Sequence, residues 1–364
     1  MNLVPPCRAK DMQNNPWAVL SPYLIPPPLA GKKICNLGDG FILRAIERHL
    51  GCRFASDRVF SPRVEPSARA QKQMSTAHGV VLAGANQLND KYTVWPGLNM
   101  TAAVDAGYRF IPFGIGLHGE PGFNDSMSSA TRAIIELIHE RIPFSSWRCS
   151  LTVDYLRQSL PHLADRFLMT GCPVIYDTPL LEGERFDSSE ATVAVTATER
   201  GEFWDRENDI IHMAARRFPK ARKFFVVHQN FSPGRWHEPL RHRFGRITAS
   251  AIPDQVERLR FVARQLGFRV VVPKSADACL DFYAGVDVHV GTRLHAHLLF
   301  LSRNKRSYLV PVDGRATGIA QALGFPLPMP ADLEKHWDFD FETVRHNTRE
   351  HYKTMKKFIE SLTQ

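Results

Sequence analysis

Short apolar runs alternate with longer amphipathic segments along most of the chain. Runs rich in β-branched and aromatic residues predict strands at residues 79–82, 109–115, 192–196, 223–227, 268–272, 286–290 and 308–312. Segments with helical periodicity predict helices at residues 41–50, 129–141, 152–159, 205–217, 254–266, 294–301 and 317–323. Nearly continuous apolar strands that alternate with helices are typical of parallel sheets covered on both faces. The pattern therefore predicts an α/β fold.

The chain is long enough for two such domains. It has 364 residues, and a single hydrophobic core stops growing at roughly 250–300 residues. Pro143 ends the helix expected at 129–141, so we place the boundary near residue 145. We therefore expect one α/β domain at 31–145 and a second at 146–335.

The two ends of the chain have patterns of their own. Seven prolines lie in the first thirty residues, and proline removes a backbone donor, so we expect an extended arm without regular structure at 1–30. Residues 336–364 predict a terminal helix with one apolar stripe, formed by Tyr352, Met355, Phe358, Ile359 and Leu362. Such a stripe needs a surface to cover, and the first domain is one candidate.

Composition narrows the class of protein. With 44% hydrophobic and 23% charged residues the chain is globular, and it has no apolar run long enough to span a membrane. The first residues lack the apolar segment of a secretory signal, so we expect a cytoplasmic protein. The six cysteines include no C-x-x-C pair, which argues against a zinc site or a disulfide framework.

The net charge of +9 would suit nucleic acid, an anionic membrane surface or a small polyanionic substrate. Basic residues are interleaved with acidic ones and no nucleic-acid-binding motif occurs, so we expect no nucleic-acid partner. The arginine-rich segment 231–246 has two interpretations: a peripheral contact with an anionic membrane or polymer, or an exposed loop.

Glycine-bearing turns follow several predicted strands, where parallel sheets bind their ligands. The segment 36–40 holds Gly38 and Asp39 just before a helix, and Asp39 is either a helix cap or a ligand to a substrate hydroxyl. Asn86 and Asn89 follow the strand at 79–82, and His118 lies in a glycine-rich turn after the next strand. None of these turns forms a P-loop or a complete dinucleotide-binding motif.

The densest group of reactive side chains lies at 288–297. An apolar strand ends at Gly291, and Thr292, Arg293, Leu294 and His295 then lead into a helix. Arginine presents a planar fork that matches carboxylate or phosphate, and histidine exchanges protons near neutral pH. His289 and His297 are expected to be core or supporting residues, since the first lies in the strand and the second on the helix.

Two further segments could converge on this place. Arg148 stands just before the helix expected at 152–159, where its guanidinium either faces the site or pairs on the surface. His228 and Asn230 close the strand at 223–227, where turn formation and helix capping are the alternative roles.

Taken in order, these segments resemble the polysaccharide pyruvyl transferases from about Lys33 to Pro326. The matching features are N-x-G-D at 36–39, G-I-G at 114–116, Arg148 leading a helix with a Tyr-Leu pair, and G-x-R-L-H-A at 291–296. The resemblance implies a GT-B-like fold, with two Rossmann-like domains and a cleft between them. It also implies transfer of pyruvate from phosphoenolpyruvate onto two hydroxyls of a sugar, as a cyclic ketal, in a polysaccharide, a glycolipid or its precursor.

The resemblance assigns roles to particular residues. It places the donor on Arg148, Arg293, Leu294 and His295, with Thr292 beside them, and His118 is our candidate for a first-domain histidine that faces the donor. The acceptor side would hold Gly38, Asp39, Asn86, Asn89, His228 and Asn230. Three features depart from the family pattern: Cys149 replaces an acidic residue, Asp313, Gly314 and Arg315 replace an aromatic residue and a lysine, and the segment 84–86 is poorer in glycine.

The expected chemistry suits these residue types. Phosphoenolpyruvate carries close to three negative charges, which arginine forks neutralise. We expect His295 to donate a proton on the phosphate side, and Asp39 or His118 to take one from the acceptor hydroxyl. No metal and no cofactor are needed beyond phosphoenolpyruvate as co-substrate. The alternative is a GT-B glycosyltransferase with a nucleotide-sugar donor.

Overall fold

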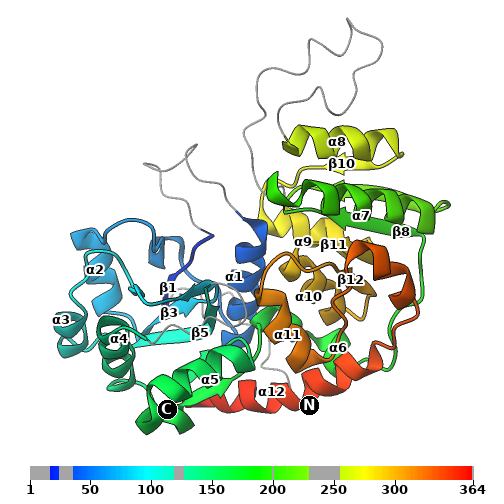
Figure 1. The fold of residues 1–364 in the computed structure, drawn as a ribbon. Coiled ribbons are helices and arrows are strands. Elements are labelled where there is room, and N and C mark those ends of the chain that lie inside the picture. The colour runs from blue at the N-terminus through cyan, green and yellow to red at the C-terminus, as the bar shows by residue number, and fades with distance from the viewer. Residues whose placement is uncertain (1–16, 24–35, 119–126, 199–200, 229–254, 363–364) are drawn as a thin grey trace, which may run out of the picture.

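The computed structural model describes residues 17–23, 36–118, 127–198, 201–228 and 255–362, and they form two parallel sheets flanked by helices (Figure 1). This confirms the α/β prediction. All seven predicted strands are present, as β3, β5, β8, β9, β10, β11 and β12, with bounds that differ by at most a few residues.

The first sheet has the strand order β2-β1-β3-β5-β6-β7, and β4 pairs with β5. Its strands are β1 (Trp17–Leu20), β2 (Val59–Phe60), β3 (Gly79–Ala83), β4 (Asn86–Leu88), β5 (Phe110–Leu117), β6 (Ser145–Trp147) and β7 (Phe167–Met169). The helices in this part of the chain are α1 (Leu37–Leu50), α2 (Ala68–Ser75), α3 (Met100–Asp105), α4 (Ser129–His139), α5 (Ser150–Ser159) and α6 (Thr178–Glu182). Every strand pair is parallel, so the carboxyl ends of these strands share one edge.

The second sheet has the order β10-β9-β8-β11-β12 and is also parallel. Its strands are β8 (Thr192–Thr196), β9 (Arg222–Val226), β10 (Arg269–Val271), β11 (Val288–Gly291) and β12 (Ser307–Leu309). The helices are α7 (Trp204–Arg217), α8 (Gln255–Gln265), α9 (Ala276–Ala284), α10 (Leu294–Ser302), α11 (Arg315–Leu323) and α12 (Glu342–Leu362). Short 3-10 helices lie at Ser56–Arg58, Pro161–Arg166, Pro173–Ile175, Gly201–Phe203 and Pro330–His336.

Two sequence-based expectations need correction. We expected no regular structure before residue 30, but Trp17–Leu20 form β1, a fully buried strand between β2 and β3. We placed the division between the halves near residue 145, but β6 and β7 continue the first sheet to Met169. The two sheets therefore divide between β7 and β8.

The terminal helix α12 runs along the lower side of both halves in Figure 1 and reaches the first sheet. Its apolar stripe lies inward: the ring centroids of Phe358 and Phe113, on β5, are 5.0 Å apart, and both side chains are fully buried. The rings of Tyr352 and Tyr176 also pack together, at 5.2 Å. Burying a large aromatic side chain contributes roughly 2–3 kcal/mol, so α12 joins the two halves through their core.

Helix α1 joins the halves on the side of the strand ends. The Leu37 backbone N–H donates to the carbonyl of His228, which follows β9 in the second half, at 3.1 Å. About two turns further along α1, Arg44 forms a two-pronged ion pair with Asp277 of α9, at 2.6 and 2.7 Å. These contacts fix the start of α1 against the second sheet.

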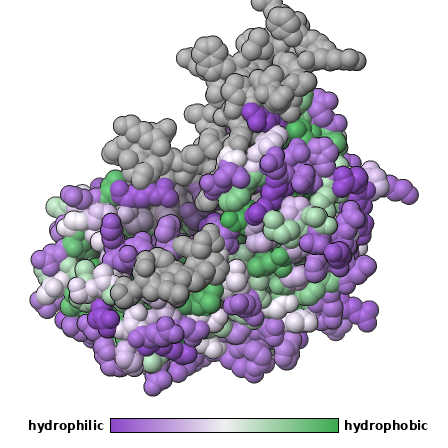
Figure 2. All heavy atoms as spheres, viewed as in Figure 1, coloured by the Kyte–Doolittle hydropathy of each residue, from purple (hydrophilic) through white to green (hydrophobic). Residues whose placement is uncertain are grey.

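The face seen in Figure 2 is mostly hydrophilic, with hydrophobic side chains in small scattered groups. Among the described residues, Val272 and Met329 are the large hydrophobic side chains that stand exposed. No helix in the described part of the chain is long and apolar enough to cross a membrane.

Candidate active site

The turn from β11 into α10 is held firmly in place. The Arg293 guanidinium donates from Nε to the carbonyl of Ala197, at 2.6 Å, and from a terminal nitrogen to the carbonyl of Thr198, at 2.8 Å. Both carbonyls belong to the segment after β8, the neighbouring strand. Thr292 and Leu294, on either side of Arg293, are buried. The arginine predicted from the sequence is therefore fixed at the carboxyl edge of the second sheet.

Arg148 lies at the corresponding edge of the first sheet, just after β6. Its side chain is only 2% exposed and rests on Gly116 of β5, so closely that a Cβ there would collide with the guanidinium. Among the described residues, Nε of Arg148 has no hydrogen-bond partner. A buried guanidinium N–H without a partner is costly, which makes this N–H a candidate contact for a ligand.

Asn86 lies beside this arginine. It is in register with Gly116 across the β4–β5 pair, and its buried Oδ1 has no partner within the described chain either. Asn86 is thus the predicted acceptor residue that the structure brings near Arg148.

His295 brings the two halves together. A Cβ on Gly38, near the start of α1, would lie 2.7 Å from Nδ1 of His295, so only glycine allows α1 and α10 to approach this closely. Nε2 of His295 is buried and has no partner in the described part of the chain. The site therefore forms where the amino-terminal ends of α1 and α10 meet, and such ends attract anions.

The electrostatics of the site are dominated by cations. Burial, together with the nearby Arg148 and Arg315, lowers the pKa of His295 to about 3, so the imidazole is neutral without a ligand. Burial also raises the pKa of Asp39 to about 6, an effect that Arg63 and Arg315 partly offset. We expected a histidine that titrates near neutral pH, but Asp39 is the group in the site that does so.

Arg315 and Arg63 were not predicted as site residues. Arg315 begins α11 and pairs with Asp313, with Nε 2.8 Å from both carboxylate oxygens. Gly318, in the first turn of α11, packs against Cys149, which follows Arg148, and this contact brings α11 to the site. Arg63 follows β2. The sequence signal for Arg315 was its place in the segment that departs from the family pattern.

Other predicted residues lie elsewhere or have structural roles. His118 is exposed at the end of β5, and no described side-chain contact joins it to Arg148 or His295. The Asn89 side chain accepts from the Lys91 N–H, as in a turn. His228 is buried, with Nε2 2.6 Å from the Tyr283 hydroxyl, and burial places its pKa well below the usual value. Asn230 and the segment 231–246 lie outside the described residues.

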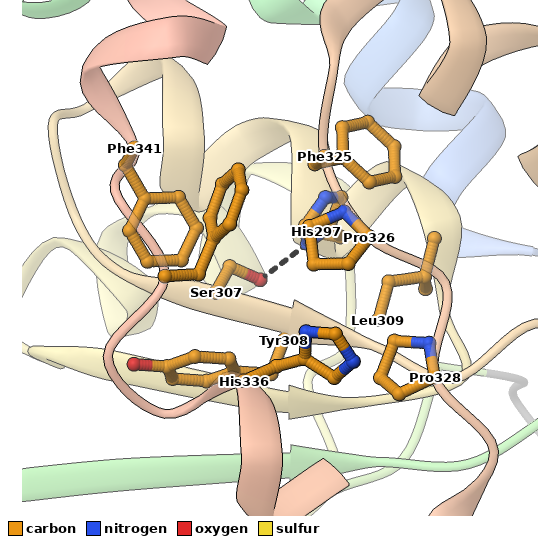
Figure 3. A pocket seen from close by; sticks show the side chains of 10 residues that line it. His297, Ser307, Tyr308, Leu309, Phe325, Pro326, Pro328, His336 and Phe341 are labelled. Atoms are coloured by element: carbon orange, nitrogen blue, oxygen red, sulfur yellow. Dashed lines mark hydrogen bonds between the residues drawn. The ribbon is translucent and has the colours of Figure 1, made fainter. Parts of the chain in front are cut away.

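His289 and His297 are core residues, as predicted. Ser307 Oγ lies 2.7 Å from Nδ1 of His289 and 2.8 Å from Nδ1 of His297. Figure 3 shows His297 beside Phe325 and Pro326, in the wall of a small, mainly apolar cavity behind α10. This buried pair supports the strand and helix that carry Arg293 and His295.

Comparisons with known proteins bear on the family. The chain is similar to the solved structure of UDP-GlcNAc 2-epimerase from Neisseria meningitidis bound to UDP-GlcNAc, with 11% identity over 94% of this chain and 99% of that one and a TM-score of 0.47. It is also similar to the wall teichoic acid polymerase TagF (H444N variant), with 8% identity over 98% of this chain and 86% of that one and a TM-score of 0.41. At these scores neither similarity bears on function. Among curated proteins none matches.

The family profile is decisive. The profile described as polysaccharide pyruvyl transferase matches residues 36–314. That span begins at the cap of α1, contains Arg148, Arg293 and His295, and ends one residue before Arg315. The chain belongs to the polysaccharide pyruvyl transferase family.

Proposed function

We propose that this protein transfers pyruvate from phosphoenolpyruvate onto two hydroxyls of a sugar, forming a cyclic ketal and releasing phosphate. Family membership supports pyruvyl transfer in polysaccharide synthesis. The main support for this donor is a pair of buried nitrogens that have no hydrogen-bond partner among the described residues: Nε of Arg148 on the first half and Nε2 of His295 on the second. Both are available to a ligand that lies between the halves.

The charge of the site suits this donor. Phosphoenolpyruvate presents a phosphate and a carboxylate on a three-carbon frame, and guanidinium groups bind both in two-pronged fashion. Arg148 and Arg293 come from opposite halves, so each can take one anionic end. Arg315 adds a third positive charge close enough to Arg148 and His295 to lower the pKa of both.

The reaction moves two protons, both of which come from the acceptor hydroxyls. C3 of the enol gains a proton, C2 becomes electrophilic, and the first sugar hydroxyl adds to C2 and loses its proton. The C2–O bond to phosphate then breaks, the second hydroxyl adds, and its proton leaves. Two hydroxyl protons are released, one is taken up at C3, and the other leaves with phosphate, so the reaction balances without a redox partner.

Asp39 and His295 are placed to carry out different proton transfers. A pKa of about 6 leaves Asp39 mostly ionised at neutral pH, so its carboxylate can accept a proton from the acceptor hydroxyl. His295 is neutral in the free site because burial and nearby arginines disfavour its charge. The negative charge of bound phosphoenolpyruvate favours the protonated imidazole and so raises the pKa of His295. The imidazole can then take up a proton and donate it toward the phosphate. Asp39, Gly38 and Asn86 form the acceptor side.

Phosphate release from phosphoenolpyruvate in the presence of acceptor sugars tests the proposal. His295→Ala and Arg293→Ala should abolish most turnover while the proteins stay folded. His336→Ala, outside the site, is the control and should retain activity. Stabilisation of the wild-type protein by nucleoside diphosphates but not by phosphoenolpyruvate would instead favour a nucleotide-sugar glycosyltransferase.

A further inference from the structure

A buried carboxylate lies directly behind Arg293. Glu207 is in the first turn of α7 and its side chain is 1% exposed. Its Oε1 accepts hydrogen bonds from the Thr198 backbone N–H, from the Thr198 hydroxyl at 2.7 Å and from the Thr292 hydroxyl at 3.0 Å. One oxygen thus ties together the segments that follow β8 and β11.

These hydrogen bonds close a ring that includes Arg293. Thr198 donates to Glu207 through its N–H and hydroxyl, and its carbonyl accepts from the Arg293 guanidinium at 2.8 Å. Thr292 donates to the same carboxylate and is the residue just before Arg293. Glu207 therefore holds the side chain of Arg293 through Thr198 and the backbone of Arg293 through Thr292.

The carboxylate is well hydrogen-bonded in spite of its burial. Burial raises the pKa of Glu207, and the threonine donors and the nearby Arg293 oppose that rise. Removing a charged group from water costs free energy unless it is hydrogen-bonded, and here three donors meet one carboxylate oxygen. A carboxylate is useful here if the direction of the Arg293 guanidinium matters.

We propose that Glu207 is a positioning residue for the donor: it fixes the Thr198 carbonyl and Thr292, and through them aims Arg293 at the phosphoenolpyruvate. This rests on the proposed function, in which Arg293 binds the donor. The carboxylate acts on ground-state binding, so its loss should raise the KM for phosphoenolpyruvate and leave kcat nearly unchanged.

The test compares conservative variants in steady-state phosphate release. Thr292→Val keeps the shape but removes one donor to the carboxylate, and Thr292→Ser keeps the donor. Glu207→Gln removes the charge. We expect Thr292→Val and Glu207→Gln to raise KM for phosphoenolpyruvate about tenfold, with kcat within about twofold of wild type, and Thr292→Ser to restore wild-type KM.

Glu190→Gln is the matched control, because Glu190 precedes β8 at its opposite end and pairs with Arg217 and Arg306. Its KM should not change. An unchanged KM in folded Glu207→Gln and Thr292→Val proteins, even with lower melting temperatures, would make Glu207 merely structural and overturn the proposal. Equal impairment of Thr292→Ser and Thr292→Val would overturn it too, since packing would then be the cause.

Failure of the proposed function gives a different result. Wild-type protein would then release no phosphate with any acceptor, and binding alone would decide the role of Glu207. Phosphoenolpyruvate should raise the melting temperature of wild type and Glu190→Gln, and do so only at higher concentration for Glu207→Gln. The positioning role would be overturned if the half-maximal rise in melting temperature needed the same phosphoenolpyruvate concentration in all three proteins. It would also be overturned if phosphoenolpyruvate raised the melting temperature of none of them.

Discussion

The imidazole of His295 lies against the Cα of Gly38, so that a methyl group on Gly38 would be 2.7 Å from Nδ1. Gly38 belongs to the first turn of α1 and His295 to the first turn of α10, and the two helices come from different halves of the chain. The contact sets the distance between the halves at the point where we place the donor. It also explains a glycine in a helix, where glycine is otherwise unfavourable.

Gly38→Ala should therefore impair the reaction more than the fold. The added methyl must displace a buried imidazole, because contacts under 3.0 Å are not tolerated. We expect turnover of phosphoenolpyruvate to fall at least about tenfold, while alanine's better helix propensity, about 1 kcal/mol, limits the loss of stability. Gly285→Ala is the control, since a Cβ there would meet only the Phe282 carbonyl, at 3.8 Å. Wild-type kinetics for Gly38→Ala would contradict the assigned role of His295.

Arg148→Lys tests the geometry of the guanidinium rather than its charge. Lysine keeps the charge but loses the planar fork and the Nε donor that has no partner among the described residues. We expect kcat/KM for phosphoenolpyruvate to fall at least about tenfold, because the variant loses one charge-assisted hydrogen bond to the donor. Arg157→Lys, on the exposed side of α5, should behave as wild type. Equal kinetics for the two variants would remove Arg148 from the donor site.

Asp39→Asn should show a pH-dependent gain in stability. Because the folded state raises the pKa of Asp39 to about 6, it holds a proton that the unfolded chain releases near pH 4, and the wild-type protein loses stability as pH rises from about 4 to 6. Asparagine does not ionise. The folded state raises the pKa of Asp39 from 3.8 to about 6, and each pKa unit corresponds to about 1.4 kcal/mol, so the free energy of unfolding in urea should be about 3 kcal/mol higher for Asp39→Asn at pH 7.5 and close to wild type near pH 4.

Asp332 provides the control, because replacing it by asparagine should change the free energy of unfolding at pH 7.5 in the opposite direction. Its pKa is lowered by the Lys335 hydrogen bond, so Asp332→Asn should lower stability slightly at pH 7.5 and not at low pH. A pH-independent difference between Asp39→Asn and wild type would contradict the buried position of Asp39.

Phe358→Ala tests the joining of the two halves by α12. The side chain is fully buried against Phe113 of the first sheet, so its removal should cost about 3–5 kcal/mol in the free energy of unfolding. Lys353→Ala, on the exposed side of the same helix, should change stability by less than about 0.5 kcal/mol. Similar unfolding curves for the two variants would show that α12 does not contribute to the core.

The sequence predicts the long elements well because their periodicity is strong. All seven strands with continuous apolar runs are present, whereas β1 was hidden among prolines and β6, with the sequence Ser-Ser-Trp, has no apolar run. These two strands are stabilised by neighbours that are distant in sequence, and β2, β4 and β7, which were also not predicted, are only two or three residues long. The boundary near residue 145 was wrong for that reason, since only the sheet pairing of β6 and β7 reveals where the first sheet ends.

The candidate site was predictable where motif and strand end coincide. Arg148, Arg293 and His295 were found in this way, and the structure places them at the facing edges of the two sheets. Arg315 and Glu207 could not be found from local patterns, because only folding brings the start of α11 and the first turn of α7 to the donor side. His118 illustrates the converse: it stands after a glycine-rich strand end but is exposed.

The mass of the product distinguishes pyruvyl transfer from glycosyl transfer. Wild-type protein would be incubated with phosphoenolpyruvate and a panel of hexosides, with His295→Ala as the inactive control. For a pyruvyl transferase, we expect one hexoside to gain the mass of a pyruvate less one water, with one phosphate released for each product formed. A sugar that gains a hexose from a nucleotide sugar, with phosphoenolpyruvate left unconsumed, would contradict this expectation.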